Sequence, residues 1–335
     1  VSIDSLLLEG NLFLAPVAGY SDRAFRSVCY QGGANFAYTE MISSEALYRS
    51  SEKTHQLMLR APNEKQYGVQ IFGGDPLIMG EAAKIVVNQV HPELIDINAG
   101  CPVPKIIKTG AGSALTRDPE RLYAVTKSVV TSVAEVDSKI PVTVKIRSGW
   151  DDKTITWKEA ACAALEAGAK AITLHPRTRA QGYEGKADWQ KLADLVSLVS
   201  SKNKNIPVFG SGDIFSPEDA KQMLEQTQCQ GVMFARGAMG NPFIFRQTKE
   251  LLIHNTFMEI PISERLEIGL QELDLLIGDK GEQVACREMR KRFCGYSKGI
   301  SGGAQIRLQI VAAETREDYL KLVLPYFQNR EFKLQ

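Results

Sequence analysis

The sequence predicts an α/β fold in which a (β/α)8 TIM barrel is followed by a smaller all-α helical-bundle domain. Short apolar, β-rich runs recur over the first 240 residues, and seven of the eight are followed by a helix-forming stretch. Near-continuous apolar runs are typical of parallel strands that are covered on both faces. An open doubly wound sheet is the alternative, and it is disfavoured because no early G-x-G-x-x-G follows the first strand.

The predicted strands follow one another at the spacing of βα units. They cover residues 12–17, 35–39, 66–72, 94–98, 141–146, 171–175, 206–210 and 230–235. The clearest helices between them cover residues 118–133, 158–167 and 217–225. The last of these begins with a capping box, in which Ser216 is the N-cap, Pro217 lies in the first turn and Asp219 completes the box.

Strand patterns stop near residue 260, and helix-period sequence continues from there. The predicted helices of this region cover residues 263–276, 283–296, 303–313 and 315–327. Residues 254–261 form the predicted junction. We therefore expect two domains, a barrel over residues 1–250 and a helical domain over residues 260–335.

Composition excludes several classes of protein. The net charge of +1 gives no whole-molecule field for nucleic acid, so any basic site must be local. No apolar run approaches 18 residues and the first residues lack a signal-peptide pattern, so neither a membrane span nor secretion is expected. Six cysteines without C-x-x-C spacing and four unpaired histidines argue against a metal site and predict a reducing, cytoplasmic setting. A monomer is the favoured oligomeric state.

Polar and charged residues that could bind a ligand or take part in catalysis lie at the carboxyl ends of the predicted strands, where such barrels have their active sites. They are Gln70, Asn98, Lys145, Arg147 and His175, followed by Arg177 and Arg179. Each alone has a structural explanation, as a satisfied core amide, a salt-bridge partner or a loop brace. Their coincidence at matching strand ends favours a shared functional cavity.

Cys101 is the most informative of these positions. It follows Asn98 in the turn Asn98-Ala99-Gly100-Cys101-Pro102, where glycine frees the backbone and proline stiffens it. Because an ordinary thiol has a pKa of about 8.5, it is mostly protonated at neutral pH. The sequence therefore predicts a thiol that is held out at a strand end and can serve as a proton donor as well as a nucleophile.

Glycine-rich turns follow the last two predicted strands, at Gly210-Ser211-Gly212-Asp213 and at Ala235-Arg236-Gly237. Barrels of this kind commonly hold a phosphate there, on backbone N–H groups. Arg236 would add a positive charge. These turns predict a phosphate pocket beside the central cavity.

A basic helix face is predicted in the C-terminal region. Arg287, Arg290 and Lys291 share a face by i, i+3, i+4 spacing, opposite an apolar stripe of Met289, Phe293 and Tyr296. Together with Arg292, Lys298 and Arg307 they make six positive charges against Glu288 alone. The pattern predicts either an RNA contact or a solvated helix face.

Taken together, these segments resemble the tRNA-dihydrouridine synthase family. The matching segments are residues 14–26, 39–42, 69–73, 96–102, 110–115, 145–147, 175–179, 211–214, 235–245 and 287–291. The Asn-x-Gly-Cys-Pro turn is the most specific of them. Three positions depart from the usual family residue: Val17 replaces Met, Ala235 replaces Gly and Arg292 replaces His.

The resemblance implies an FMN enzyme that uses NADPH or NADH to reduce the 5,6 double bond of a uridine in tRNA. It places Pro16, Val17, Ala18, Gln70, Lys145 and His175 at the flavin, and Ser211, Gly212, Asp213, Ala235 and Arg236 around its phosphate end. Cys101 becomes the catalytic acid. Substrate or tRNA contacts are expected from Asn98, Arg147, Arg177, Arg179, Arg287, Arg290 and Lys291.

Two alternatives remain open from the sequence. One is an FMN oxidoreductase on a free pyrimidine, which resembles the dihydroorotate dehydrogenases and has no need of a basic helical extension. The other is a non-catalytic RNA-binding protein, which leaves Lys145 and Cys101 at the strand ends unexplained.

Overall fold

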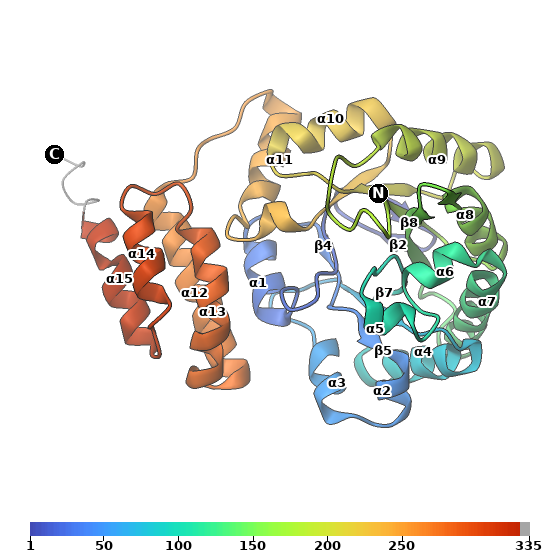
Figure 1. Ribbon diagram of the computed structural model, residues 1–335, viewed down its shortest axis with the longest axis horizontal. Helices are drawn as coiled ribbons and strands as arrows, with labels where there is room; N and C mark the ends of the chain where they lie inside the picture. Colours follow the sequence, from blue (N-terminus) through green and yellow to red (C-terminus); the bar gives the residue numbers. More distant parts are fainter. Residues whose placement is uncertain (329–335) are drawn as a thin grey trace.

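A computed structural model describes residues 1–328 and shows an α/β barrel with a group of helices at its side (Figure 1). The barrel strands are β3 (Leu12–Leu14), β4 (Phe36–Ala37), β6 (Gly68–Phe72), β7 (Leu94–Ala99), β8 (Val142–Asp151), β10 (Ile172–Thr178), β11 (Val208–Ser211) and β12 (Gly231–Phe234). They pair in parallel in that order, and β12 pairs with β3. A bridge between Tyr38 and Gly68 closes the ring beyond β4. The predicted fold class is confirmed.

Helices cover the outside of the ring. They are α1 (Arg23–Gln31), α2 (Ser44–Tyr48), α3 (Glu52–Met58), α4 (Pro76–Val90), α5 (Pro104–Ile107), α6 (Ser113–Arg117), α7 (Pro119–Val136), α8 (Trp157–Glu166), α9 (Trp189–Lys202), α10 (Pro217–Thr227) and α11 (Ile244–His254), with a 3-10 turn, η1 (Arg236–Ala238). The predicted capping box is present at α10, where Ser216 and Asp219 satisfy each other's backbone N–H groups. No helix within residues 1–328 combines the length and the apolar character needed to cross a membrane.

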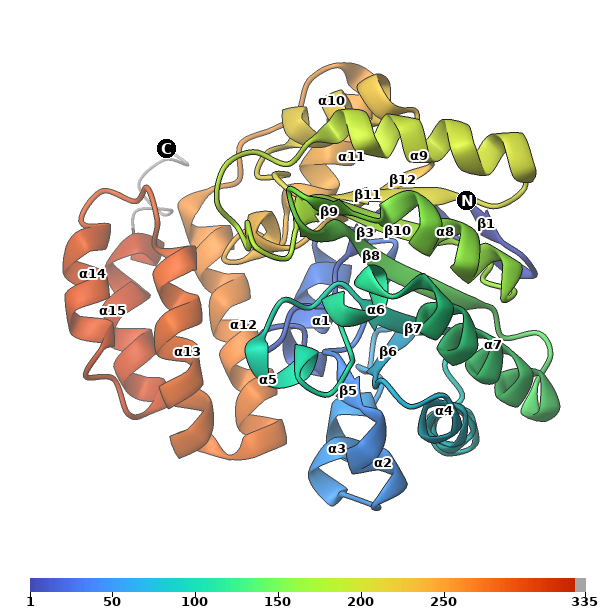
Figure 2. The same cartoon turned by 45° about the vertical axis from the view of Figure 1, so that its right-hand side comes forward.

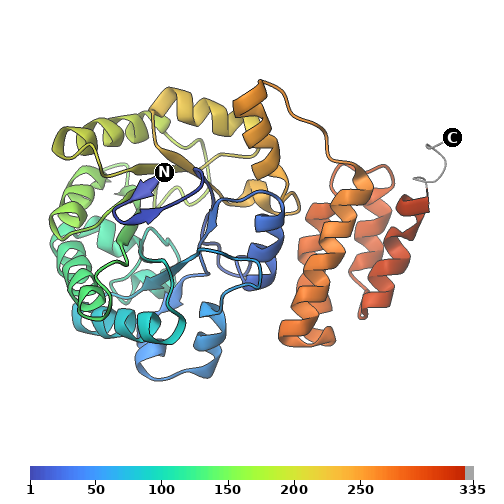
Figure 3. The same ribbon diagram turned by 180° about the vertical axis from the view of Figure 1, so that it is seen from behind.

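Short strands that depend on a partner were missed by the sequence. An N-terminal hairpin of β1 (Ser2–Ile3) and β2 (Leu6–Leu7) lies across the end of the barrel that is nearest the viewer in Figure 3. Its Ile3 packs with Phe13 and Phe209 in a separate buried cluster. The hairpin therefore closes the amino-terminal end of the barrel and leaves the other end as the open one. The other short strands are β5 (Ile42–Ser43) and β9 (Thr154–Ile155), which pair with β6 and β8.

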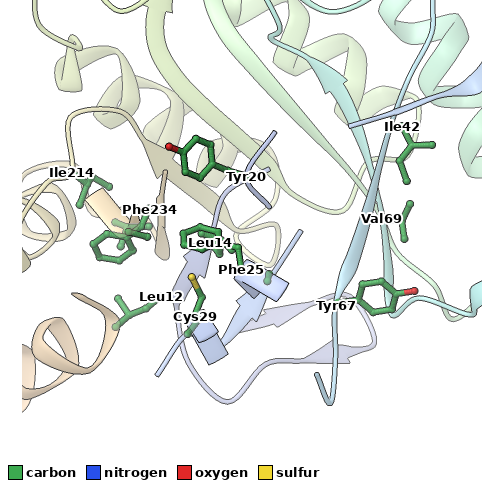
Figure 4. Packing of buried hydrophobic residues seen from close by; sticks show 14 of the residues in the cluster. Leu12, Leu14, Tyr20, Phe25, Cys29, Ile42, Tyr67, Val69, Ile214 and Phe234 are labelled. Carbon is green, nitrogen blue, oxygen red and sulfur yellow. The ribbon is translucent and has the colours of Figure 1, made fainter. Parts of the chain in front are cut away.

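The larger hydrophobic cluster joins the outer faces of the strands to the helices around them. Figure 4 shows Cys29 of α1 in this cluster, with Leu12, Leu14 and Phe25 labelled nearby. Cys29 is fully buried, and burial raises the pKa of its thiol well above the ordinary value. Its role is therefore packing.

The C-terminal helices stand beside the barrel, as Figure 2 shows in orange and red. They are α12 (Ile262–Lys280), α13 (Glu282–Tyr296), α14 (Gly303–Ile310) and α15 (Arg316–Gln328). Helix α12 packs on α1 of the barrel and on α13 and α15. The last seven positions of the expected helical domain, 329–335, lie outside the described residues.

Buried ion pairs hold this helical group against the barrel. Arg292 of α13 is 4% exposed and binds Asp22, the N-cap of α1, and Glu272 of α12 at 2.7 and 2.6 Å. Tyr296 donates a hydrogen bond to the second oxygen of Glu272, and Lys280 binds Asp22 at 3.2 Å. Although burial acts to lower it, the two carboxylates hold the pKa of Arg292 above its usual value. Counting Arg292 among the surface charges of α13 was therefore wrong, since its charge is used inside the interface.

Replacement of Arg292 by methionine is expected to lower the free energy of unfolding by about 3–5 kcal/mol, because buried Glu272 loses its ion pair and buried Asp22 loses one of its two. Urea denaturation followed by circular dichroism measures the change. The matched control is Arg316→Met, which removes a half-exposed pair with Asp274 and should cost less than about 1 kcal/mol. Equal losses in the two variants would contradict the assignment of Arg292 as the interface ion.

Candidate active site

A cavity of about 430 Å³ opens at the carboxyl ends of the barrel strands. Its volume lies in the range of small-molecule and cofactor sites. Its lining includes Pro16, Val17, Ala18, Gln70, Asn98, Cys101, Lys145, Arg147, His175, Ser211, Gly212, Asp213, Ala235, Arg236 and Lys291. The structure thus brings most of the residues singled out in the sequence into one space. Among residues 1–328, no group of histidine, cysteine and carboxylate side chains is arranged to hold a metal ion.

Cys101 lies at the wall of this cavity, in the turn after β7. Its backbone N–H and that of Gly100 donate to Oδ1 of Asn98 at 2.9 and 3.2 Å. The backbone carbonyls of the same turn accept from Ser113, whose N–H bonds Cys101 and whose hydroxyl bonds Gly100. These bonds hold the backbone of the turn through both its N–H groups and its carbonyls. The position of the thiol is therefore set by the backbone of the turn.

The thiol is suited to hold a proton. Burial raises the pKa of Cys101, although the Val103 N–H and the charges of Arg147 and Lys145 act in the opposite direction. The side chain is 9% exposed, so the cavity is its access to solvent. At neutral pH the residue is therefore a neutral thiol, as a proton donor requires.

Lys145 and Arg147 line the same wall from β8, as strand alternation predicted. Burial lowers the pKa of Lys145 to about 8, with Arg147 acting in the same direction and Asp96 against it. Arg147 is held by the carbonyls of Thr178 and Gly182 at 3.0 and 2.9 Å. Two cations therefore face the cavity next to Cys101, an arrangement suited to an anionic or electron-rich ligand.

His175 is neutral in this site. Burial, followed by the charges of Arg147 and Lys145, lowers its pKa well below the usual value. Its Nε2 lies 3.3 Å from Nη1 of Arg177, and because a guanidinium only donates, Nε2 accepts and the ring proton lies on Nδ1. The imidazole therefore offers a hydrogen-bond donor without adding charge.

Arg177 was expected at RNA, and the structure places it elsewhere. It is 1% exposed and bonds the carbonyls of Glu184 and Gly185, and it pairs with Asp213 at 2.7 Å. The structure thus supports the alternative role of a loop brace. Burial acts to raise the pKa of Asp213, but hydrogen bonds from Arg177 and the Ala187 N–H hold it below its usual value.

The turns after β11 and β12 form the end of the cavity that the sequence predicted for a phosphate. Gly212 has a φ of +104°, and a Cβ there would lie 2.6 Å from the His175 ring, so only glycine lets this turn approach the imidazole. Arg236 is half-buried and lies 3.5 Å from Asp213, whose charge Arg177 already balances. One positive charge is left over at this end, which fits a phosphate.

The wall opposite Lys145 is formed by the turn after β3. Val17 donates its backbone N–H to the Ser21 hydroxyl at 2.9 Å, and the Ser21 hydroxyl bonds back to the Val17 carbonyl. Pro16, Val17 and Ala18 line the cavity through this fixed segment. A flat ring system can lie against it, as the resemblance implies, with valine in place of methionine.

Helix α13 reaches the cavity through Lys291. Its ammonium lies 4.5 Å from the ring centre of Tyr20, and both residues line the opening. Arg287 is exposed, whereas Arg290 is half-buried and donates to the carbonyl of Ala313 at 2.9 Å. Within residues 1–328, Arg287 and Lys291 are therefore the exposed cations of the predicted face, and Arg290 belongs to the helix packing.

Three residues that contact predicted site residues were not themselves predicted from the sequence. Tyr183 lies on the loop after β10, with Arg147 and Arg236 at 5.8 and 4.6 Å from its ring centre. Asp96 lies below the cavity within a run of apolar residues, where its carboxylate was the available signal. Trp150 stacks with Arg179, whose guanidinium lies 4.6 Å from the ring centre.

Comparison with known proteins gives a consistent family. Residues 13–331 match the family model described as dihydrouridine synthase (Dus). The chain is 54% identical to a probable tRNA-dihydrouridine synthase of Treponema pallidum over 323 residues, which are 96% of this chain and 95% of the relative. It is 37% identical to tRNA-dihydrouridine synthase B of Vibrio cholerae over 98% of this chain and 99% of the relative. A probable tRNA-dihydrouridine synthase of Aquifex aeolicus is 32% identical over 94% and 95%.

Alkylation of Cys101 by iodoacetamide, followed on its own peptide, is expected to rise with pH and to reach half its limiting rate above the pKa of an ordinary thiol, about 8.5, because burial raises the pKa of Cys101. Arg147→Met should move this midpoint higher, since the guanidinium keeps its charge in this pH range and stabilises the thiolate. Lys158→Met, on the exposed face of α8, is the control and should leave it unchanged. A midpoint below that of a free thiol would contradict the protonated state.

Proposed function

The chain belongs to the dihydrouridine synthase family, and from that premise we propose that it reduces the 5,6 double bond of a uridine in tRNA, with FMN as cofactor and NADPH or NADH as reductant. The family makes it an oxidoreductase. The single observation that carries the finer proposal is the convergence of Cys101, Lys145 and His175 on one cavity at the carboxyl end of the barrel.

The cavity lining fits FMN in its shape and in its charges. Pro16, Val17 and Ala18 would face the flavin ring system together with Gln70 and Lys145. Ser211, Gly212, Asp213, Ala235 and Arg236 would surround the phosphate end, where one positive charge is left over. When bound, FMN reduced by NADPH or NADH supplies the hydride for the pyrimidine.

Cys101 is the proposed catalytic acid. The thiol proton passes from its Sγ to one carbon of the 5,6 double bond while the other carbon receives the hydride, and solvent returns the proton to the thiolate. The thiol is neutral and therefore has a proton to donate. Lys145 and Arg147 then stabilise the thiolate that remains after the proton has left. Asn98 and Arg147 line the same cavity, where they would contact the base.

The helical group over residues 260–335 is the proposed tRNA-binding domain, beside a catalytic domain over residues 1–250. A base in folded RNA must leave its stack to enter a barrel cavity, which requires backbone contacts around the opening. Arg287 and Lys291 supply charge on one side, and Arg179 supplies charge on the rim after β10. Because Lys291 lines the cavity itself, the helical group is part of the site, which disfavours a free pyrimidine as substrate.

In Cys101→Ala, dihydrouridine formation in tRNA is expected to fall by at least about 100-fold, since general acid catalysis contributes 10²–10⁴-fold. Bound flavin, measured from its visible absorbance, should stay at the level of the unmodified protein. Cys162→Ala, which alters a cysteine of α8 away from the cavity, should keep full activity. Full activity of the Cys101 variant would rule out the proposed acid.

Arg287→Gln combined with Lys291→Gln is expected to weaken tRNA binding and to reduce the slope of log K against log salt by about one to two, because each phosphate contact contributes a little under one. Filter binding between low and moderate salt measures both quantities. Lys202→Gln with Lys204→Gln removes two exposed charges at the amino-terminal side of β11 and should change neither. An unchanged slope in the α13 variant would mean that this face is only solvated.

A further inference from the structure

A continuous chain of hydrogen bonds runs from the barrel interior to the turn that carries Cys101. Asp96 accepts from Thr143 Oγ1 through one oxygen and from Gln70 Nε2 through the other, each at 2.6 Å. Gln70 Oε1 accepts from Asn98 Nδ2 at 2.8 Å. Asn98 Oδ1 then accepts the backbone N–H of Cys101 at 2.9 Å. The chain crosses three adjacent strands in register, since Gln70 pairs with Asp96 and Asp96 pairs with Thr143.

The direction of these bonds is set at the carboxylate end. An ionised carboxylate only accepts, so it selects the orientation in which Gln70 turns its Nε2 toward Asp96. Gln70 then presents its oxygen to Asn98, and Asn98 must present its own oxygen to the Cys101 turn. If Gln70 were reversed, its donor would face the donor of Asn98, and the N–H groups of Gly100 and Cys101 would lose their acceptor.

We propose that Asp96 is a positioning residue for the proposed reaction: through Gln70 and Asn98 it fixes the backbone that holds the Cys101 thiol at the cavity. These three side chains form the Asp96 relay. The inference rests on the proposed role of Cys101, and it adds a residue that itself lies outside the cavity lining.

Burial and charge agree with this role. Asp96 is 1% exposed, and burial raises its pKa to about 6, against the two hydrogen bonds and the charge of Lys145. The carboxylate is therefore mostly ionised at neutral pH, as an acceptor-only group must be. Removal of this carboxylate would leave the donors of Gln70 and Thr143 without their acceptor in a buried region.

Thr143 supplies a control for the relay. It bonds the same carboxylate but lies on the side away from Gln70, so Thr143→Val removes one bond of Asp96 without touching the relay. Asp96→Leu, by contrast, removes the group that orients Gln70. The two variants disturb the same buried region and differ in whether the turn at Cys101 is released.

The test is backbone hydrogen exchange in the flavin-loaded protein, resolved at Gly100 and Cys101, together with kcat and KM for tRNA. In Asp96→Leu we expect exchange at both amides to rise at least tenfold and kcat to fall at least tenfold, with KM within twofold. Thr143→Val should leave all four quantities within twofold. Asp96→Asn retains an oxygen for Gln70 while its amide faces the Thr143 hydroxyl, so it should restore most of the lost kcat and the slow exchange.

Equal exchange and equal kcat in Asp96→Leu and Thr143→Val would overturn the proposal, because Asp96 would then act only as a buried polar group. If Asp96→Leu fails to fold, Gln70→Leu breaks the same relay one step closer to the turn and should give the same rise in exchange. Unchanged exchange in that variant would also overturn it. Since hydrogen exchange does not depend on turnover, a failure of the proposed function remains distinguishable from a failure of the relay.

Discussion

The parallel register of β6, β7 and β8 is the constraint on which the site depends. It pairs Gln70 with Asp96 and Asn98 with Lys145, so that polar side chains of neighbouring strands meet at one level of the barrel. A shift of one residue in any of these strands would turn its polar side chains toward the surrounding helices. The apolar residues between them, such as Ile95 and Ile97, pack outward against those helices and hold the register.

The buried charges at the α13 interface are paired with charges of opposite sign, whereas the buried charges at the cavity are mainly positive. At the interface with α13, Arg292 is matched by Asp22 and Glu272, and the result is a closed structural contact. At the cavity, Asp96 acts on Lys145 while it already receives two neutral hydrogen bonds, and burial together with the charge of Arg177 acts to lower the pKa of Arg147. Burial, followed by the charge of Arg147, lowers the pKa of Lys145 despite the opposing charge of Asp96, and the two neighbouring cations favour an electron-rich ligand there.

Local sequence was sufficient to predict the eight barrel strands, because each is an apolar run of ordinary length followed by a turn. It was insufficient for β5 and β9, which are two residues long and exist only through their partners. Site residues at strand ends were predicted for the same reason that the strands were. The burial of Arg292 and Arg177 was not predicted. Asp22, the partner of Arg292, is distant from it in the sequence, and Arg177 bonds an irregular loop. Neither the hydrophobic period nor the residue spacing indicates burial in such cases.

The interface and the cavity are coupled through consecutive residues of α13. Successive helix residues are rotated by about 100°, so when Arg292 is fixed against Asp22, Lys291 is directed toward Tyr20 and the cavity opening. Asp22 is also the N-cap of α1, whose preceding turn contains Val17 and Ala18 of the cavity wall. The ion pair between Arg292 and Asp22 therefore aligns one wall of the cavity with the helix that contributes Lys291. Arg292 therefore contributes to the geometry of the site by positioning Lys291, although Arg292 itself does not line the cavity.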